Sequence, residues 1–278
     1  MLNKNQPSFA FARRTRLAFF SLAITAVSFV SCKGDKDDVK PDDGNPPAED
    51  KGFLPQKDQV YDYKITDTDG TKSSSVLKVL GVKDSSGIAV YDIENKIQEG
   101  NVFVTTKNRA FSKGGLTTYE LFYEDGINAI YENVEEFGVI KDVVLKGFPQ
   151  KQIMENKGTV GSNITFSKEP MEIKLELLIP IDENDSIEAD FQAKITYLDG
   201  KVTKQETITT PAGTFNCSKW EYKYETYLKL TSLAIPMEER EDEYTVELWT
   251  APGVGIVKTV ETTGDAVSTT ELQKITKQ

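Results

Sequence analysis

Short runs in which apolar and polar residues alternate, separated by turn residues, recur along the chain from Phe53 onward. The run Val60–Ile65, for example, is followed by the turn sequence Thr68-Asp69-Gly70-Thr71 and then by a second run, Ser75–Leu80. A period of two places successive side chains on opposite faces of a strand. Because no long stretch has a helical period, we expect a mainly β protein with one large, antiparallel, strongly curved sheet or half-barrel.

The positions of the turn residues predict the individual elements. Only 134–142 and 232–243 suggest short helices. Strands are expected at 60–65, 75–80, 88–93, 101–106, 117–123, 127–132, 164–166, 173–180, 187–198, 204–209, 215–230, 243–250, 255–260 and 269–275. The segment Lys51–Lys57 resembles Lys146–Lys151, which suggests two similar halves, 53–146 and 147–278. No Pro/Ser-rich linker separates these halves, so one continuous sheet is favoured.

Residues 1–31 are organised as a secretion signal. They contain four cationic side chains and no acidic one, and the apolar run Leu17–Val30 leads to Ser31 and Cys32. Such a run is typical of a signal peptide and is too short for a comfortable transmembrane helix. The segment resembles the lipobox of bacterial lipoproteins, with Phe29 where leucine is usual. This resemblance implies cleavage before Cys32 and acylation of that residue, with palmitate among the expected chains. The alternative is an ordinary signal with an incidental cysteine.

An acidic tether is expected between the lipidation site and the folded domain. Residues 33–52 contain three prolines, seven acidic residues and almost no apolar ones, so this segment is expected to be disordered. Its root-mean-square reach is about 25 Å. Within it, Lys36-Asp37-Asp38 resembles the export signal of Bacteroidetes surface lipoproteins. That resemblance implies display at the cell surface, on the outer membrane, and the periplasmic face is the alternative. The β domain is expected at 53–278, after Cys32 and its tether at 32–52.

Composition excludes several classes of function. The net charge is −11, and loss of the four cationic residues in 1–31 takes it to −15. So acidic a protein is not expected to bind nucleic acid, which requires clustered Lys and Arg. The chain has no histidine, the commonest general base and transition-metal ligand. If Cys32 is acylated, Cys217 has no partner for a disulfide. We therefore expect no catalytic residues, no metal and no cofactor.

Two motifs in the C-terminal third are the most specific pattern in the chain. They are Thr207–Cys217, which reads TITTPAGTFNC, and Leu248–Lys258, which reads LWTAPGVGIVK. Pro-Ala-Gly and Ala-Pro-Gly-Val-Gly are both expected to form turns or bulges at strand ends. The pair resembles a broad group of Bacteroidetes lipoproteins of unknown function. The resemblance implies a curved antiparallel sheet or half-barrel and no established activity. That group resembles lipoprotein carriers such as LolA only in fold, so ligand binding is an analogy.

Other candidate sites have simpler structural explanations. The aromatic stretch Trp220–Tyr227 is interpreted as one half-buried strand rather than as a ligand platform. Asp67–Gly70 lacks the later ligands of a calcium loop and is interpreted as a turn. The acidic runs 182–185 and 238–243 are interpreted as solvated loops, with weak calcium binding as the alternative. Cys217 is expected to be a buried structural thiol.

Three hypotheses for function remain. The favoured one is a non-enzymatic, membrane-anchored envelope lipoprotein whose curved β-sheet binds an apolar ligand or a partner protein. An alternative is an accessory subunit of a surface nutrient-uptake complex. The third is a carboxylate-based glycan hydrolase, since two acids suffice for that chemistry. Nothing in the sequence selects the two acids.

Overall fold

The computed structural model describes residues 52–99, 102–121, 139–180, 185–232 and 238–277. In this part of the chain there are fourteen strands in one antiparallel sheet and no helix. The strands are β1 (Gln59–Asp67), β2 (Lys72–Ser85), β3 (Ile88–Glu99), β4 (Val102–Lys113), β5 (Leu116–Leu121), β6 (Val139–Lys146), β7 (Gln150–Glu155), β8 (Asn163–Phe166), β9 (Met171–Pro180), β10 (Ser186–Thr210), β11 (Gly213–Ser232), β12 (Glu238–Ala251), β13 (Gly255–Thr263) and β14 (Ala266–Lys277). The mainly β, antiparallel prediction is confirmed.

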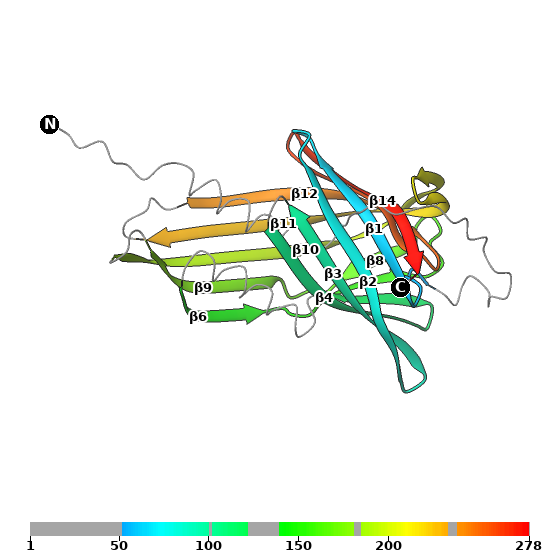
Figure 1. Ribbon diagram of the computed structural model, residues 1–278, viewed down its shortest axis with the longest axis horizontal. Helices are drawn as coiled ribbons and strands as arrows, with labels where there is room; N and C mark the ends of the chain where they lie inside the picture. Colours follow the sequence, from blue (N-terminus) through cyan, green and yellow to red (C-terminus); the bar gives the residue numbers. More distant parts are fainter. Residues whose placement is uncertain (1–51, 100–101, 122–138, 181–184, 233–237, 278) are drawn as a thin grey trace.

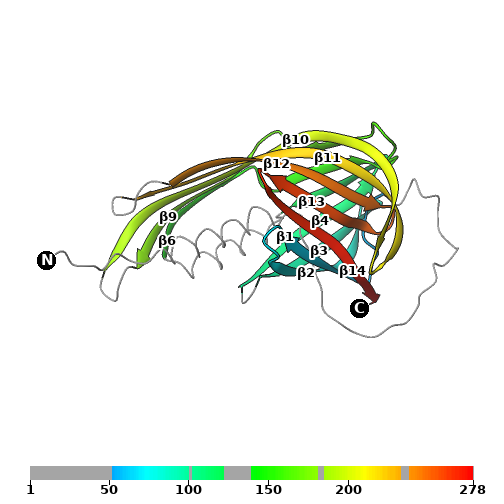
Figure 2. The same ribbon diagram turned by 90° about the horizontal axis from the view of Figure 1, so that it is seen from above.

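Twelve of the strands close into a barrel (Figures 1 and 2). Their order is β11-β12-β13-β14-β1-β2-β3-β4-β5-β7-β8-β10, and the pairing of β10 with β11 completes the ring. The sheet therefore curves further than the expected half-barrel. It is also continuous across residue 146, as favoured over two separate halves.

The remaining strands extend the sheet beyond the barrel as a wing, which we define as β6, β9, residues 186–195 of β10, 226–232 of β11 and 238–244 of β12. β10 pairs with β9 over Ser186–Ile195, but with β8 only at Gly200 and Lys201. β12 pairs with β13 only from Thr245 onward. Each long strand thus leaves the ring part of the way along its length, and Figure 2 shows the wing projecting from the barrel.

The turn residues lie where their sequence predicts. Gly70 has a φ of 82° in the β1–β2 turn, where the Asp69 carboxylate accepts a 2.8 Å hydrogen bond from the amide of Thr71. Gly213 has a φ of 140° after Pro211 and Ala212, and Gly253 has a φ of 71° between β12 and β13. Both glycine motifs are therefore turns between antiparallel strands. Asp67–Gly70 is the hairpin turn expected in place of a calcium loop.

Several predicted boundaries were wrong. Residues 139–142 belong to β6 and 238–243 to β12, so the described parts of both expected helices are strands. The expected strands at 187–198 and 204–209 are a single strand, β10, and β6 and β7 were not anticipated. The expected strand at 127–132, residues 134–138 and residues 182–184 of the first acidic run lie outside the described residues.

Candidate functional site

The sequence-predicted functional residues are all in the N-terminal segment. Cys32 and the export-signal residues Lys36, Asp37 and Asp38 lie outside the described residues. The described chain starts at Gly52, at the barrel end that also carries the start of β1 and the end of β14. The wing leaves the opposite end of the barrel, so Gly52 and the wing lie at opposite ends.

The segment 52–55 closes the barrel end at which the described chain begins. Phe53 is 1% exposed and packs edge-on against Trp220, with 5.5 Å between ring centroids. Its amide donates to Thr117 Oγ1 at 3.0 Å, and its carbonyl accepts a 2.6 Å hydrogen bond from the Tyr119 hydroxyl. The amide of Gly253 donates to the carbonyl of Gly52. The chain itself therefore fills this end of the barrel.

The cavity next to this segment is small. It has a volume of about 30 Å³ and lies between Pro55, Tyr63, Tyr119 and Met154. That volume holds roughly one water molecule. An apolar ligand of the size of an acyl chain does not fit in this cavity.

The half of the barrel nearer the wing has a polar interior centred on Glu261 of β13. Its side chain is 5% exposed, and burial raises its pKa to about 8, with a further increase from Asp67 and an opposing hydrogen bond from Tyr224. The Tyr224 hydroxyl donates to Glu261 Oε2 at 3.3 Å. Glu261 Oε1, Tyr222 Oη and Thr259 Oγ1 are buried without a hydrogen-bond partner in the described structure. The sequence analysis did not single out Glu261, because the alternation in 255–263 alone does not show which face of β13 points into the barrel.

The aromatic strand supplies Tyr222 and Tyr224, two of the tyrosines close to Glu261. Trp220, Tyr222 and Tyr224 are at most 3% exposed and point into the barrel, as predicted for core aromatics. Tyr224 stacks on Tyr244 with 4.6 Å between ring centroids. Tyr227 does not share the face of the other aromatic residues. Side chains alternate along a strand, so the odd-numbered Tyr227 lies on the side of β11 opposite to the even-numbered Trp220, Tyr222 and Tyr224. There its hydroxyl donates to Glu239 at 3.1 Å.

One face of the wing is apolar. Its buried residues form a cluster of their own, with partly buried neighbours from β6 and β11. The buried members are Leu175, Leu177, Ile179, Ala189 and Phe191. Because these side chains have little exposed surface, this face is not an open ligand site.

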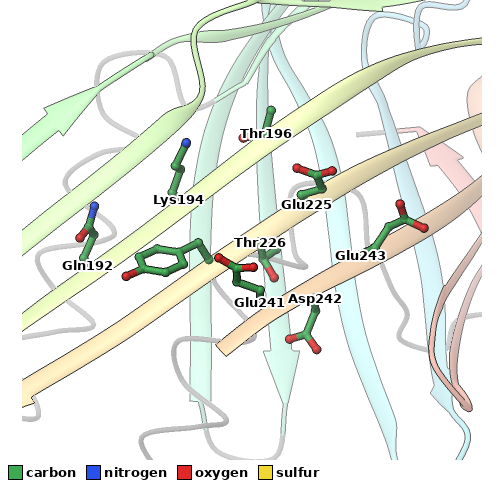
Figure 3. Close-up of a pocket in the computed structure, with 9 residues that line it drawn as sticks. Gln192, Lys194, Thr196, Glu225, Thr226, Glu241, Asp242 and Glu243 are labelled. Atoms are coloured by element: carbon green, nitrogen blue, oxygen red, sulfur yellow. The ribbon is translucent and has the colours of Figure 1, made fainter. Parts of the chain in front are cut away.

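The other face of the wing holds an open, polar groove of about 660 Å³ (Figure 3). Thr196, Glu225 and Glu243 form one cross-strand row of its lining, and Lys194, Tyr227 and Glu241 form the next. Lys223 Nζ lies 2.7 Å from Glu243 Oε1. Small-molecule sites are usually concave and mostly apolar. By that standard the groove does not resemble a small-molecule site.

The second acidic run is part of this groove rather than a loop. Residues 238–243 are the first residues of β12, so the prediction that this run is a loop was wrong. In the described residues, no group of three or more His, Cys, Asp or Glu side chains is placed to hold a metal ion. No helix in the described segments is long and apolar enough to cross a bilayer.

Cys217 is the buried structural thiol that the sequence predicted. It is 3% exposed in β11 and packs with Trp249, Ala251 and Val257. Burial, with a smaller contribution from Glu206, raises the pKa of its thiol to about 12. It is not an activated nucleophile, because the reactive form of cysteine is the thiolate.

Comparison with known proteins identifies one partial family match. A family model described as DUF3108-like matches residues 170–272, from β9 to β14, and this range contains both glycine motifs. Curated proteins give no match. Two solved structures resemble the chain, each with a TM-score of 0.47 and each covering 81% of this chain and 99% of its own. One, 16% identical, is from Bacteroides fragilis and is described as exported, with a YmcC-like fold. The other, 18% identical, is from Parabacteroides distasonis and is described as a lipoprotein.

Proposed function

We propose that this protein is a non-enzymatic envelope lipoprotein, anchored through Cys32, whose wing docks a partner protein. Of the two ligands expected from the sequence, a polypeptide suits the structure better than an apolar small molecule. In the described structure, the cavity beside the closed end of the barrel has a volume of only about 30 Å³. The apolar wing face is buried, whereas the polar face and the wing edges are accessible.

The observation that carries this proposal is the projection of the wing from the barrel end opposite Gly52 (Figure 2). A domain held at the membrane by a tether entering at one end presents its other end to the surroundings. Lys36-Asp37-Asp38 supports display on the cell surface, as an expectation from resemblance. Lack of histidine, and of a metal-binding group in the described residues, supports a non-enzymatic role.

Site-specific photo-crosslinking in cells tests the docking role. A photoreactive phenylalanine analogue replaces Tyr227 in the wing groove, and Leu80, which is 51% exposed on β2, serves as the barrel control. We expect a discrete adduct, identified by mass spectrometry, from position 227 and none from position 80. Equal labelling at both positions, or none at either, would contradict a docking role for the groove of the wing.

The anchor is tested separately by Cys32→Ser in the full chain. We expect this variant to leave the membrane fraction, because the acyl chains supply the attachment. Protease treatment of intact cells then distinguishes the cell surface from the periplasmic face for the unsubstituted protein.

A further inference from the structure

The edge strand β6 has features of a docking edge. In the described part of the sheet it pairs only with β9, so its other side presents unpaired backbone groups to a further strand. It also carries exposed apolar side chains, with Val139 65% and Val144 39% exposed. Exposed edges usually carry charges that prevent such pairing. β6 carries only three charged residues among its eight, Lys141, Asp142 and Lys146, so it is less protected than an edge that is charged throughout.

The opposite edge of the wing is protected. β12 has no partner beyond β11 before Thr245 in the described structure, and every residue from 239 to 243 is charged. The two wing edges therefore differ in polarity, since the β12 edge is charged at every position from 239 to 243 and the β6 edge carries exposed valines. Only β6 suits the addition of a strand.

The bulge in β6 limits the part that can pair. The register with β9 shifts between Ile140 and Asp142, and the strand is regular from Asp142 to Lys146. Along this part, Asp142, Val144 and Lys146 lie on the polar face of the wing. Val143 and Leu145 lie opposite Leu175 and Ile173, on the apolar face.

We infer that the strand that adds to β6 is β6 of a second copy, in an antiparallel register centred on Val144, an inference that rests on the proposed docking role of the wing. In this register Val144 lies opposite Val144 of the second copy. Asp142 lies opposite Lys146 of the second copy, and the two-fold symmetry makes this ion pair twice. Val143 lies opposite Leu145 of the second copy, so each face of the wing continues across the junction.

Neighbouring registers lack this complementarity. A junction centred on Asp142 opposes two like charges, which destabilises a cross-strand pair. A junction centred on Val143 places Asp142 opposite an apolar valine. In the monomer Asp142 has no ion pair within the described residues, and Lys146 is 3.8 Å from Glu172 with 57% of its side chain exposed. Both charges are therefore available to a second copy.

Attachment to one membrane favours this junction. A five-residue edge is short, and its affinity in dilute solution is expected to be modest. Tethering both copies raises their effective concentration, which promotes a weak contact without any new interaction. The predicted tether, with a reach of about 25 Å, leaves each copy free to orient its wing.

Cysteine crosslinking of the full, lipidated chain in membranes tests the register. Val144→Cys is expected to give a disulfide-linked dimer on mild oxidation, because the two Val144 positions are directly opposed. Leu80→Cys on the barrel is the matched control and is expected to stay monomeric. Native Cys217 is buried and does not compete. Failure of Val144→Cys to crosslink above the Leu80→Cys level overturns the inference.

A charge swap tests the ion pairs. Asp142→Lys and Lys146→Asp each replace two attractive pairs by repulsive ones, and we expect either change, made in Val144→Cys, to lower the yield of crosslinked dimer in membranes about tenfold or more. The double variant restores both pairs with reversed sign and should recover dimerisation. Unchanged circular dichroism shows that the variants fold. If the double variant stays as weak as the singles, the register is wrong.

The two proposals fail in distinguishable ways. A wing adduct at position 227 with a different protein, together with no Val144→Cys dimer, overturns the second copy as partner and leaves the docking role intact. No adduct at position 227 and no dimer overturns both.

Discussion

The hydroxyl of Tyr224 donates a 3.3 Å hydrogen bond to Oε2 of Glu261 inside the barrel, while Oε1 of the same carboxyl has no partner in the described structure. Ser268 lies between Glu261 and Asp67 in the cross-strand register, so the nearest charged neighbour is another acid. Tyr197 and Tyr222 also face this carboxyl, and it raises the pKa of each beyond the effect of burial. The interior therefore favours the neutral form of Glu261.

Folding should accordingly become less favourable as the pH rises through neutrality. Glu261 has a pKa raised from 4.5 to about 8 in the folded protein, mainly by burial. Its stabilising contribution is full below the unfolded pKa, falls between pH 4.5 and 8, and is lost above the folded pKa. The slope from this one group is at most about 1.4 kcal/mol per pH unit.

Glu261→Gln should flatten this part of the stability profile. The free energy of unfolding of the variant and the parent is measured in urea from pH 4 to 9. The difference between the two profiles measures the contribution of Glu261 to the pH dependence of unfolding, because the other titrating groups are common to both proteins. Glu225→Gln, on the outer face, is the control. A parent and a Glu261→Gln profile of the same shape would contradict a neutral buried carboxyl.

The indole of Trp220 provides a second test inside the barrel. Its Nε1 donates to Thr250 Oγ1 at 2.8 Å, and both residues are fully buried. Thr250→Val keeps the side-chain shape but leaves the indole N–H without an acceptor, so we expect a loss of about 1–3 kcal/mol in unfolding free energy. Thr245→Val makes the same change at an exposed site on β12 and should alter stability by less than about 0.5 kcal/mol. Equal effects would disprove the role of the hydrogen bond.

Gly200 lies where β10 passes from the wing to its short pairing with β8. A Cβ there would lie 2.1 Å from the carbonyl oxygen of Glu221, which is backbone and cannot move aside cheaply. Gly200→Ala is therefore expected to cost about 1–3 kcal/mol through overpacking. Gly81→Ala is the control, because nothing lies within 4 Å of its Cβ position. Thermal unfolding of the two variants makes the comparison, and a Gly200→Ala protein as stable as Gly81→Ala would refute the close approach.

Cys217 should be unreactive in the folded protein. The thiol is buried and its pKa is about 12, so little thiolate is present near neutral pH. A chromogenic disulfide reagent should label the Cys32→Ser chain slowly under native conditions and rapidly in denaturant. Rapid native labelling would mean that β11 opens readily or that the thiol is exposed.

Local patterns predicted most of the strands and turns. The alternation of apolar and polar residues predicted β1, β2 and β3. The turns at Gly70, Gly213 and Gly253 were predicted because glycine adopts a positive φ more easily than other residues do. The inward positions of Trp220 and Tyr224 followed from the same alternation. The helix expected near residue 140 failed because Val139–Lys146 is short and its bulge disturbs the period of two.

Barrel closure and the wing could not be predicted in this way. Closure depends on the pairing of β5 with β7 and on the long hairpin of β10 and β11, which completes the ring. The alternation within one strand does not indicate which other strand it pairs with. The wing arises because β10 exchanges β9 for β8 part of the way along its length. Glu261 was missed for a related reason, since a carboxyl on a strand is assigned to the interior only once the ring is known.

The closed end of the barrel also determines how the fold bears mechanical load. A pull on the chain before Gly52 reaches the sheet through Phe53, whose backbone is bonded to Thr117 and Tyr119 and whose ring lies against Trp220. The force is therefore shared between β5 and β11 before it reaches β1, which is held on both sides by β14 and β2. We expect such a pull to load several strands at once rather than to peel away one strand. The barrel is therefore expected to withstand a pull applied before Gly52 without unravelling from that end.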